Sequence, residues 1–121
     1  MVLIELNKPK KLLHFSYVGH VTREDLVSRR AELDEMLDEL GGSFRLLSDL
    51  TRLDFMDRDC TLEIGRVMEL CEAKGVETVV RVIPDPKKDI GLNILTQFHY
   101  SHKVRTIVSE TFAGALKILG L

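Results

Sequence analysis

The chain has no long apolar run and little net charge, and each scarcity excludes a class of function. No stretch reaches the roughly 18 consecutive apolar residues that a membrane-spanning helix requires. The 17 lysines and arginines are set against 19 aspartates and glutamates, which leaves a net charge of −2. Such a charge gives no strong attraction for nucleic acid or for an anionic membrane surface. We therefore expect the partner to be a protein or a small molecule.

Cysteine is also scarce, and the two cysteines do not predict a disulfide. Cys60 and Cys71 fall in one expected helix, where the helical rise separates them by roughly 16 Å. Bridged Cα atoms lie within about 7 Å of each other, so we interpret both thiols as small apolar groups of the core. The chain also lacks the basic segment of a secretory leader near its start, where Glu5 places a carboxylate. We expect a cytoplasmic protein.

The length of 121 residues is typical of one domain, and we expect residues 1–121 to share one core. Expected strands cover residues 2–6, 13–18, 44–50, 78–83 and 104–108. Four helical patterns follow the second, third, fourth and fifth of these strands. The order strand, strand, helix, strand, helix, strand, helix, strand, helix predicts an α/β domain. Its sheet should be mixed and mostly parallel, with about five strands and four helices.

Local signals give bounds and buried faces for the helices. Thr22 and Asp25 form a capping box that opens the first helix, which runs to Gly41-Gly42. The second runs from about Asp57 to Lys74. In the third, which starts at Pro86, the residues expected to face the core are Ile90, Ile94, Leu95 and Phe98. In the last, capped by Ser109, they are Phe112, Ala113, Leu116 and Leu119.

The segment at 47–57, Leu-Ser-Asp-Leu-Thr-Arg-Leu-Asp-Phe-Met-Asp, resembles the third strand and switch turn of a STAS domain. STAS domains are the family of bacterial anti-sigma factor antagonists. Members read roughly Asp-Leu-Ser and, a few residues later, Phe-Met/Ile-Asp-Ser-Ser-Gly-Leu, which Phe55-Met56-Asp57 matches in part. Gly75, the β-branched strand at 78–83 and Ala115-Leu116 follow in the family's order. The resemblance implies a non-catalytic regulatory domain whose protein partner is an anti-sigma factor or a kinase-like protein.

The resemblance also implies a docking surface at the turn. In the family, a partner kinase phosphorylates the second serine of the Ser-Ser-Gly turn, and the phosphorylation state decides which protein is bound. Asp59 stands at that position here. Its single charge imitates only part of the roughly −1.5 to −2 charge of a phosphoserine, and phosphorylation cannot switch it. The implied partner-binding residues are Asp57, Arg58, Asp59 and Thr61, and the candidate phosphoacceptors nearby are Thr61 and Thr51.

The residues support metal binding and catalysis less well than they support a protein-interaction domain. Carboxylates at positions 49, 54, 57 and 59 could contribute to a divalent cation site. Capping of the second helix and pairing with its dipole explain Asp57 and Asp59 better. His99 and His102 have the spacing of two metal ligands without a third. Cys60 has no histidine placed beside it by the sequence. We expect no metal, no cofactor and no catalytic residue.

A second function of another class stays open. Open parallel sheets bind ligands outside the carboxyl ends of their strands. A small-molecule or lipid-binding α/β module would use an apolar pocket between the sheet and the third helix, around Leu95, Phe98 and Tyr100. A pocket above roughly 300 Å³ there would favour this function, and a filled core would count against it. A homodimer formed through the first strand is also left open.

Overall fold

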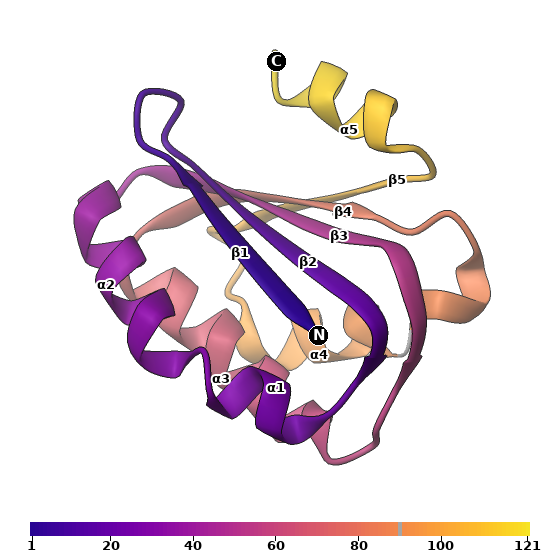
Figure 1. Ribbon diagram of the computed structural model, residues 1–121. Helices are drawn as coiled ribbons and strands as arrows, with labels where there is room; N and C mark the ends of the chain where they lie inside the picture. Colours follow the sequence, from indigo (N-terminus) through magenta and orange to yellow (C-terminus); the bar gives the residue numbers. More distant parts are fainter. Residues whose placement is uncertain (90) are drawn as a thin grey trace.

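The computed structural model describes residues 1–89 and 91–121, and its centre is a five-stranded sheet in the order β1-β2-β3-β4-β5. The strands are β1 (Val2–Asn7), β2 (Leu12–Val21), β3 (Phe44–Met56), β4 (Val76–Val82) and β5 (Arg105–Ser109). The hairpin β1–β2 is antiparallel, and every later pair is parallel. This arrangement confirms the predicted α/β class and the mixed, mostly parallel sheet (Figure 1).

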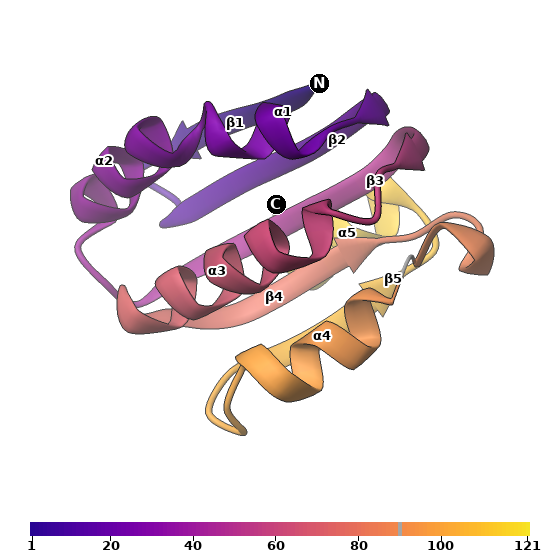
Figure 2. The same cartoon turned by 90° about the horizontal axis from the view of Figure 1, so that it is seen from below.

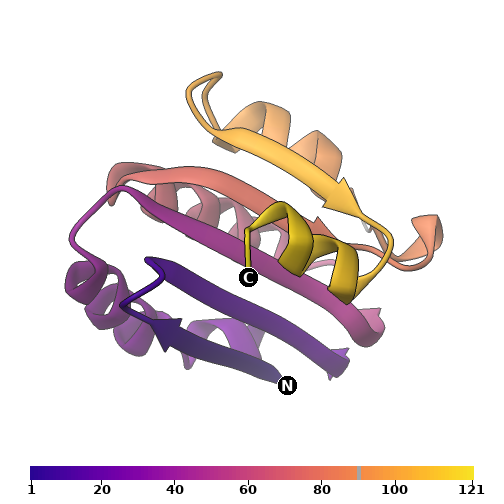
Figure 3. The same ribbon diagram turned by 90° about the horizontal axis from the view of Figure 1, so that it is seen from above.

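Helices cover both faces of the sheet unequally. One face carries α1 (Arg23–Val27), α2 (Arg30–Leu40), α3 (Cys60–Ala73) and α4 (Leu92–His99), with the short 3-10 helix η1 (Pro86–Asp89) before α4. The opposite face carries α5 (Phe112–Ile118), as Figure 3 shows. The larger core lies under α1 to α4 and includes the free, fully buried Cys60 and Cys71. Both cysteines are therefore core residues, as predicted.

The first predicted helix is two helices. Its capping box is confirmed, because the Thr22 side chain accepts from the Asp25 amide and the Asp25 carboxylate accepts from the Thr22 amide. The helix is interrupted between α1 and α2, where the Ser28 hydroxyl donates to the Asp25 carbonyl, 3.1 Å away. A hydroxyl bonded to a carbonyl one turn back competes with the helical ladder. Residues 1–89 and 91–121 therefore form five α-helices, one more than predicted.

Strand β3 runs six residues beyond the predicted end at Leu50. Its pairing with β4 stops at Asp49, while its pairing with β2 continues to Met56. Beyond Asp49 the strand is an edge, so its polar side chains can face water, and the exposed Thr51 and Arg52 do so. The extension carries the end of β3 to the end of β2, where Val21 pairs with Met56.

The buried face predicted for the third helix is wrong at two positions. Ile94 and Phe98 are 62% and 79% exposed, and Leu92 is buried in their place. The chain from Pro86 first makes a 3-10 turn and then passes through Gly91 in the left-handed conformation at φ 80° before α4 begins. This break changes the phase of the helix, so a pattern counted from Pro86 selects the wrong side. The prediction for Ile90 lies outside the described residues.

The last helix is also shifted from its prediction. Thr111, whose hydroxyl accepts from the Gly114 amide at 2.9 Å, is its N-cap, and Ser109 instead ends β5. Of the residues predicted to face inward, Leu119 is buried and Leu116 packs partly against the core, but Phe112 and Ala113 are exposed. Ala115 is the buried residue of this helix. With Thr111 as the N-cap, Phe112 is the first residue of the helix, and the residues that meet the sheet are Ala115, Leu116 and Leu119.

Candidate functional site

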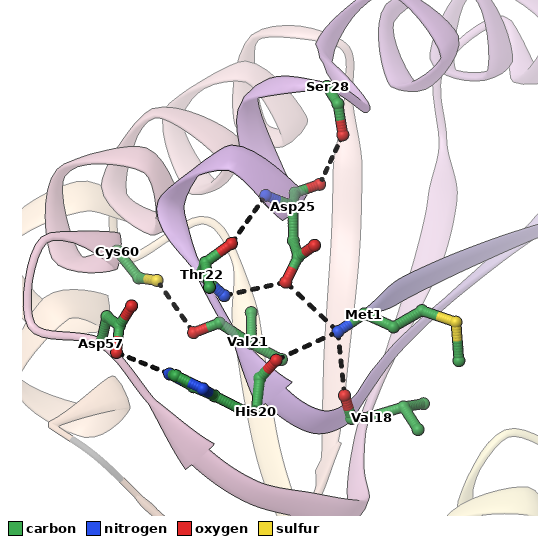
Figure 4. A network of polar contacts seen from close by, with 9 residues as sticks. All are labelled: Met1, Val18, His20, Val21, Thr22, Asp25, Ser28, Asp57 and Cys60. Carbon is green, nitrogen blue, oxygen red and sulfur yellow. Dashed lines mark hydrogen bonds and ion pairs between the residues drawn. The ribbon is translucent and has the colours of Figure 1, made fainter.

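The β3–α3 turn, residues 57–61, lies where the parallel strands end. Its backbone is tied to the end of β2, because the Asp57 amide donates to the Val21 carbonyl at 3.1 Å. The buried Cys60 thiol points to the same carbonyl, 3.6 Å away (Figure 4). Carboxyl ends of parallel strands are the usual place for binding sites in α/β sheets. The fold therefore presents this turn at the edge where function is expected.

Asp57 faces β2 and does not cap α3. Its Oδ1 accepts from Nε2 of His20 at 2.7 Å (Figure 4), and the His20 ring also lies beside Phe55, 5.3 Å between ring centroids. The Asp57 main-chain carbonyl, not its carboxylate, accepts from the Cys60 amide at 3.1 Å. The prediction that the Asp57 side chain caps α3 is therefore wrong. Sequence reasoning missed His20, which becomes its neighbour only through the parallel pairing of β2 with β3.

Asp59 occupies the N-cap position of α3 without making a side-chain cap. Its backbone is already helical, at φ −71° and ψ −4°, and its side chain makes no cap hydrogen bond within the described part of the chain. Capping side chains normally need an extended backbone at this position to reach the next amides. The prediction of capping by Asp59 is wrong, and its exposed carboxylate faces solvent.

Arg58 and Thr61 complete the turn. The amide and the hydroxyl of Thr61 both donate to the Arg58 carbonyl, at 3.1 and 2.8 Å. The structure thus brings the predicted partner-binding residues into one turn, with Arg58, Asp59 and Thr61 exposed and Asp57 half-buried. Thr51 lies six residues before Asp57 on β3, roughly 20 Å along an extended strand, and its hydroxyl donates to Asp49.

Apolar side chains are exposed beside the charged turn. A hollow of about 220 Å³ at the turn is bordered by Thr61 and by Leu95 of α4, and α4 lies alongside α3 (Figure 2). Leu62 of α3 is 70% exposed, and Ile94 and Phe98 of α4 are also exposed. A charged turn next to exposed large apolar groups is typical of a protein-interaction surface. The sequence did not reveal the α4 part, because Ile94 and Phe98 were expected inside.

Gly65 lets α4 approach α3 closely. A Cβ atom at this position would lie 2.7 Å from Nε2 of His99, which is closer than real contacts allow. The His99 ring is held there by Glu69, whose Oε2 lies 2.6 Å from Nδ1. His102 is exposed after the end of α4. Among residues 1–89 and 91–121, no group of three His, Cys, Asp or Glu side chains is placed to hold a metal ion.

The Cys60 thiol is held in its protonated form. Burial raises its pKa to about 11, and the charges of Asp59 and Asp57 add to the effect. A nucleophilic cysteine needs the thiolate, so a helix start alone does not activate this one. The arrangement favours recognition over covalent chemistry.

Within the described residues, the core nearly fills the space near α4 that a small-molecule or lipid-binding module would need. The space between the sheet and α4 is about 20 Å³, lined in part by Tyr17, Arg81 and Tyr100, which is room for about one water molecule. Buried Arg81 donates there to the Thr96 hydroxyl, and Phe98 faces solvent. The filled core at this place counts against the small-molecule or lipid-binding alternative.

Solved structures share the fold over nearly the whole chain. A protein with a SpoIIAA-like fold from Shewanella loihica PV-4 matches at a TM-score of 0.71 and 20% identity, covering 98% of this chain and 92% of its own. The phosphorylated Bacillus cell fate determinant SpoIIAA matches at 0.66 and 16%, covering 98% and 99%. An anti-sigma factor antagonist from Mycobacterium paratuberculosis matches at 0.53 and 18%, covering 100% and 94%.

The chain therefore has the SpoIIAA-like fold of STAS domains, which confirms the fold that the resemblance implied. No family model and no curated protein matches the sequence. Within the described residues, no helix combines the length and the apolar character that crossing a membrane requires.

Proposed function

We propose that this chain is a non-catalytic protein-interaction domain of the anti-sigma factor antagonist type, and that it docks a protein partner at the β3–α3 turn. One observation carries the proposal: the turn exposes Arg58, Asp59 and Thr61 together at the carboxyl edge of the sheet. The SpoIIAA-like fold supports it, since two proteins with this fold are named an anti-sigma factor antagonist and a cell fate determinant. The protonated thiol of Cys60 supports a role without covalent chemistry.

Asp59 gives the docking surface a permanent negative charge. The position corresponds to the phosphorylated serine of the STAS turn, and an aspartate there needs no kinase and cannot be reset by a phosphatase. A partner that offers an arginine gains a charge-assisted hydrogen bond to the exposed carboxylate. A partner without a basic group covers an uncompensated charge and is disfavoured. The partner class that fits is an anti-sigma factor or a kinase-like protein with a basic contact.

Thr61 is the stronger of the two candidate phosphoacceptors. It is exposed within the turn itself, so a phosphate added there would change the docking surface directly. The Thr51 hydroxyl already donates to the Asp49 carboxylate, and a phosphate at that position would meet a like charge. Phosphopeptide mapping of the protein from its own cells should find phosphate on Thr61 rather than on Thr51.

Self-association through β1 is a separate proposal. β1 is the last strand on its side of the sheet and pairs with β2 alone, so its outer edge can accept a second copy. The Met1–Val18 pair exchanges both of its main-chain hydrogen bonds, so the amide of Leu6, five residues on, points away from β2. Sedimentation of wild type against Leu6→Pro, which removes this outward-facing amide, tests the dimer. An unchanged dimer in the variant would exclude this edge.

The docking proposal is tested by measuring the affinity of a captured partner for three variants. Asp59→Ala and Asp59→Ser should each weaken binding by about tenfold, because each removes a charged acceptor. Glu77→Ala is the matched control: it removes an exposed carboxylate near the start of β4, at the opposite edge of the sheet. Unchanged binding in both Asp59 variants would exclude this turn from the mechanism.

A further inference from the structure

A groove of about 320 Å³ lies between α2 and α3, beyond the β3–α3 turn. Both helices lie on the same face of the sheet (Figure 2). The groove's apolar lining comes from the sheet and from three helices: Phe15, Leu26, Leu33, Val67 and Leu70. The volume is at the lower end of the range of small-ligand pockets, roughly 300 to 1,000 Å³. The groove is therefore large enough for a small molecule.

The rim of the groove is positively charged. Glu63 is only 2% exposed, and its carboxylate accepts from Nη2 of Arg30, from Nε of Arg30 at 3.1 Å and from Nη1 of Arg66 at 3.1 Å. Arg23 lies 3.5 Å from the same carboxylate. One buried negative charge thus faces three guanidinium groups, all of which stay partly exposed. Arg23 does not line the groove, so Arg30 and Arg66 against Glu63 leave one positive charge in excess at the rim.

The other charged residues of the groove, Arg29 and Asp34, each lie beside an opposite charge, although Lys74 is shared between Asp34 and Asp38, 2.5 Å away. Arg29 lies 2.5 Å from the Glu32 carboxylate, and Asp34 lies 3.6 Å from Nζ of Lys74. The lining itself holds Arg29, Arg30 and Arg66 against Asp34 and Glu63, so the groove carries one positive charge in excess. An apolar slot with a cationic rim is complementary to a molecule with one apolar end and one anionic end.

We propose that this groove binds a single-chain amphiphile with an anionic head group, of the fatty-carboxylate class. The hydrocarbon chain lies on the apolar lining, and the head group accepts hydrogen bonds from Arg66 and Arg30 at the rim. A helix of a protein partner fits less well, because it is about 10 Å across with its side chains and the slot is small. The site is separate from the β3–α3 turn, and it does not depend on the docking function.

The test is a titration of the full chain with sodium dodecanoate below its micelle concentration, followed by methyl NMR. Saturable shifts confined to the methyl groups of Leu26, Leu33, Val67 and Leu70 are expected. Dodecyltrimethylammonium has the same chain and the opposite charge, so it should bind at least about tenfold more weakly. An absence of saturable shifts, shifts centred elsewhere, or equal affinity for both amphiphiles would overturn the proposal.

Two variants separate the head-group contact from the chain contact. Arg66→Gln removes one exposed guanidinium and leaves Arg30 on Glu63, so dodecanoate should bind about tenfold more weakly while dodecyltrimethylammonium binds no more weakly than to wild type. Leu70→Glu places a carboxylate in the groove and should abolish dodecanoate binding. Ile118→Glu, the same kind of change at an exposed position of α5 on the opposite face of the sheet, is the control and should bind like wild type. Equal dodecanoate affinity for wild type and Arg66→Gln would also overturn the proposal.

Discussion

Nε2 of His20, at the end of β2, lies 2.7 Å from Oδ1 of Asp57, the first residue after β3. The contact joins the ends of two neighbouring parallel strands and holds the β3–α3 turn against the sheet. Both side chains are partly exposed, so water screens the pair, and its contribution to the free energy of unfolding should stay below about 1 kcal/mol. Its effect should appear mainly in the mobility of the turn.

His20→Ala should therefore loosen the turn without unfolding the domain. We expect faster amide hydrogen exchange at residues 57–61, because the Asp57 side chain loses its donor, and little change in urea unfolding. His102→Ala removes another exposed histidine, away from this contact, and serves as the control. Identical exchange at the turn in wild type and His20→Ala would show that this contact does not order it.

Acid should weaken the domain through Glu63. The hydrogen bonds and charge of Arg30, with Arg66 and Arg23, hold the pKa of this carboxyl below its ordinary value of 4.5. A group whose pKa is lowered by folding stabilises the protein above its unfolded pKa and loses that contribution as pH falls toward its folded pKa. The unfolding free energy of wild type should thus fall below about pH 4.5 by more than that of Glu63→Gln.

The Glu63→Gln variant also shows how much the Glu63 carboxylate contributes to the free energy of unfolding at neutral pH. Glu63→Gln leaves three guanidinium groups without their carboxylate, and because they can turn to solvent we expect a loss of about 1–3 kcal/mol. Glu35→Gln, an exposed position on α2, should change stability little at any pH. The range from about pH 3 to about pH 7 brackets the ordinary pKa of a carboxyl group. If the difference in unfolding free energy between wild type and Glu63→Gln is constant over this range, this account of the cluster is contradicted.

Both cysteines should resist thiol reagents in the folded protein. Burial raises the pKa of Cys60 to about 11 and that of Cys71 to about 12, so little thiolate exists near neutral pH and neither sulfur is accessible. Labelling with Ellman's reagent should be slow in buffer and complete in guanidinium chloride. Rapid labelling of native wild type that Cys60→Ala abolishes would mean that Cys60 is a reactive thiol.

Gly65 should tolerate a methyl group only when His99 is removed. In wild type, Gly65→Ala places Cβ 2.7 Å from the His99 ring, an overpacking that costs about 1–3 kcal/mol and exceeds the gain in helix propensity. In the His99→Ala background the clash is gone, and the same substitution should stabilise by about 0.5–1 kcal/mol. Urea unfolding of wild type, Gly65→Ala, His99→Ala and the double variant gives the four free energies of this double-mutant cycle. The same sign in both backgrounds would contradict the close packing of α3 and α4.

Local patterns predicted what depends on local physics. The Thr22–Asp25 capping box, the alternation of strands and helices along the chain and the buried Cys60 and Cys71 can all be read from neighbours in sequence. The exposed Phe98 could not, because the left-handed turn at Gly91 changes the phase of α4 in a way that apolar spacing does not record.

The candidate site likewise has a part that the sequence predicts and a part that it does not. The turn residues Asp57 to Thr61 are contiguous, so a motif could locate them. The His20–Asp57 contact joins positions 37 apart, and the Arg30–Glu63 pair joins positions 33 apart. Such contacts follow from the parallel pairing and from helix packing, and they need the three-dimensional structure.

The central claim is that a protein partner lies against the β3–α3 turn, and site-specific photocrosslinking tests it most directly. A benzoylphenylalanine introduced at Arg58 would sit in the exposed turn, and one at Glu77 would sit at the opposite edge of the sheet. In the source cells, the probe at position 58 should give a discrete crosslinked protein that the probe at position 77 does not. Crosslinks to the same partner from position 77 alone, or equally from both positions, would contradict the account.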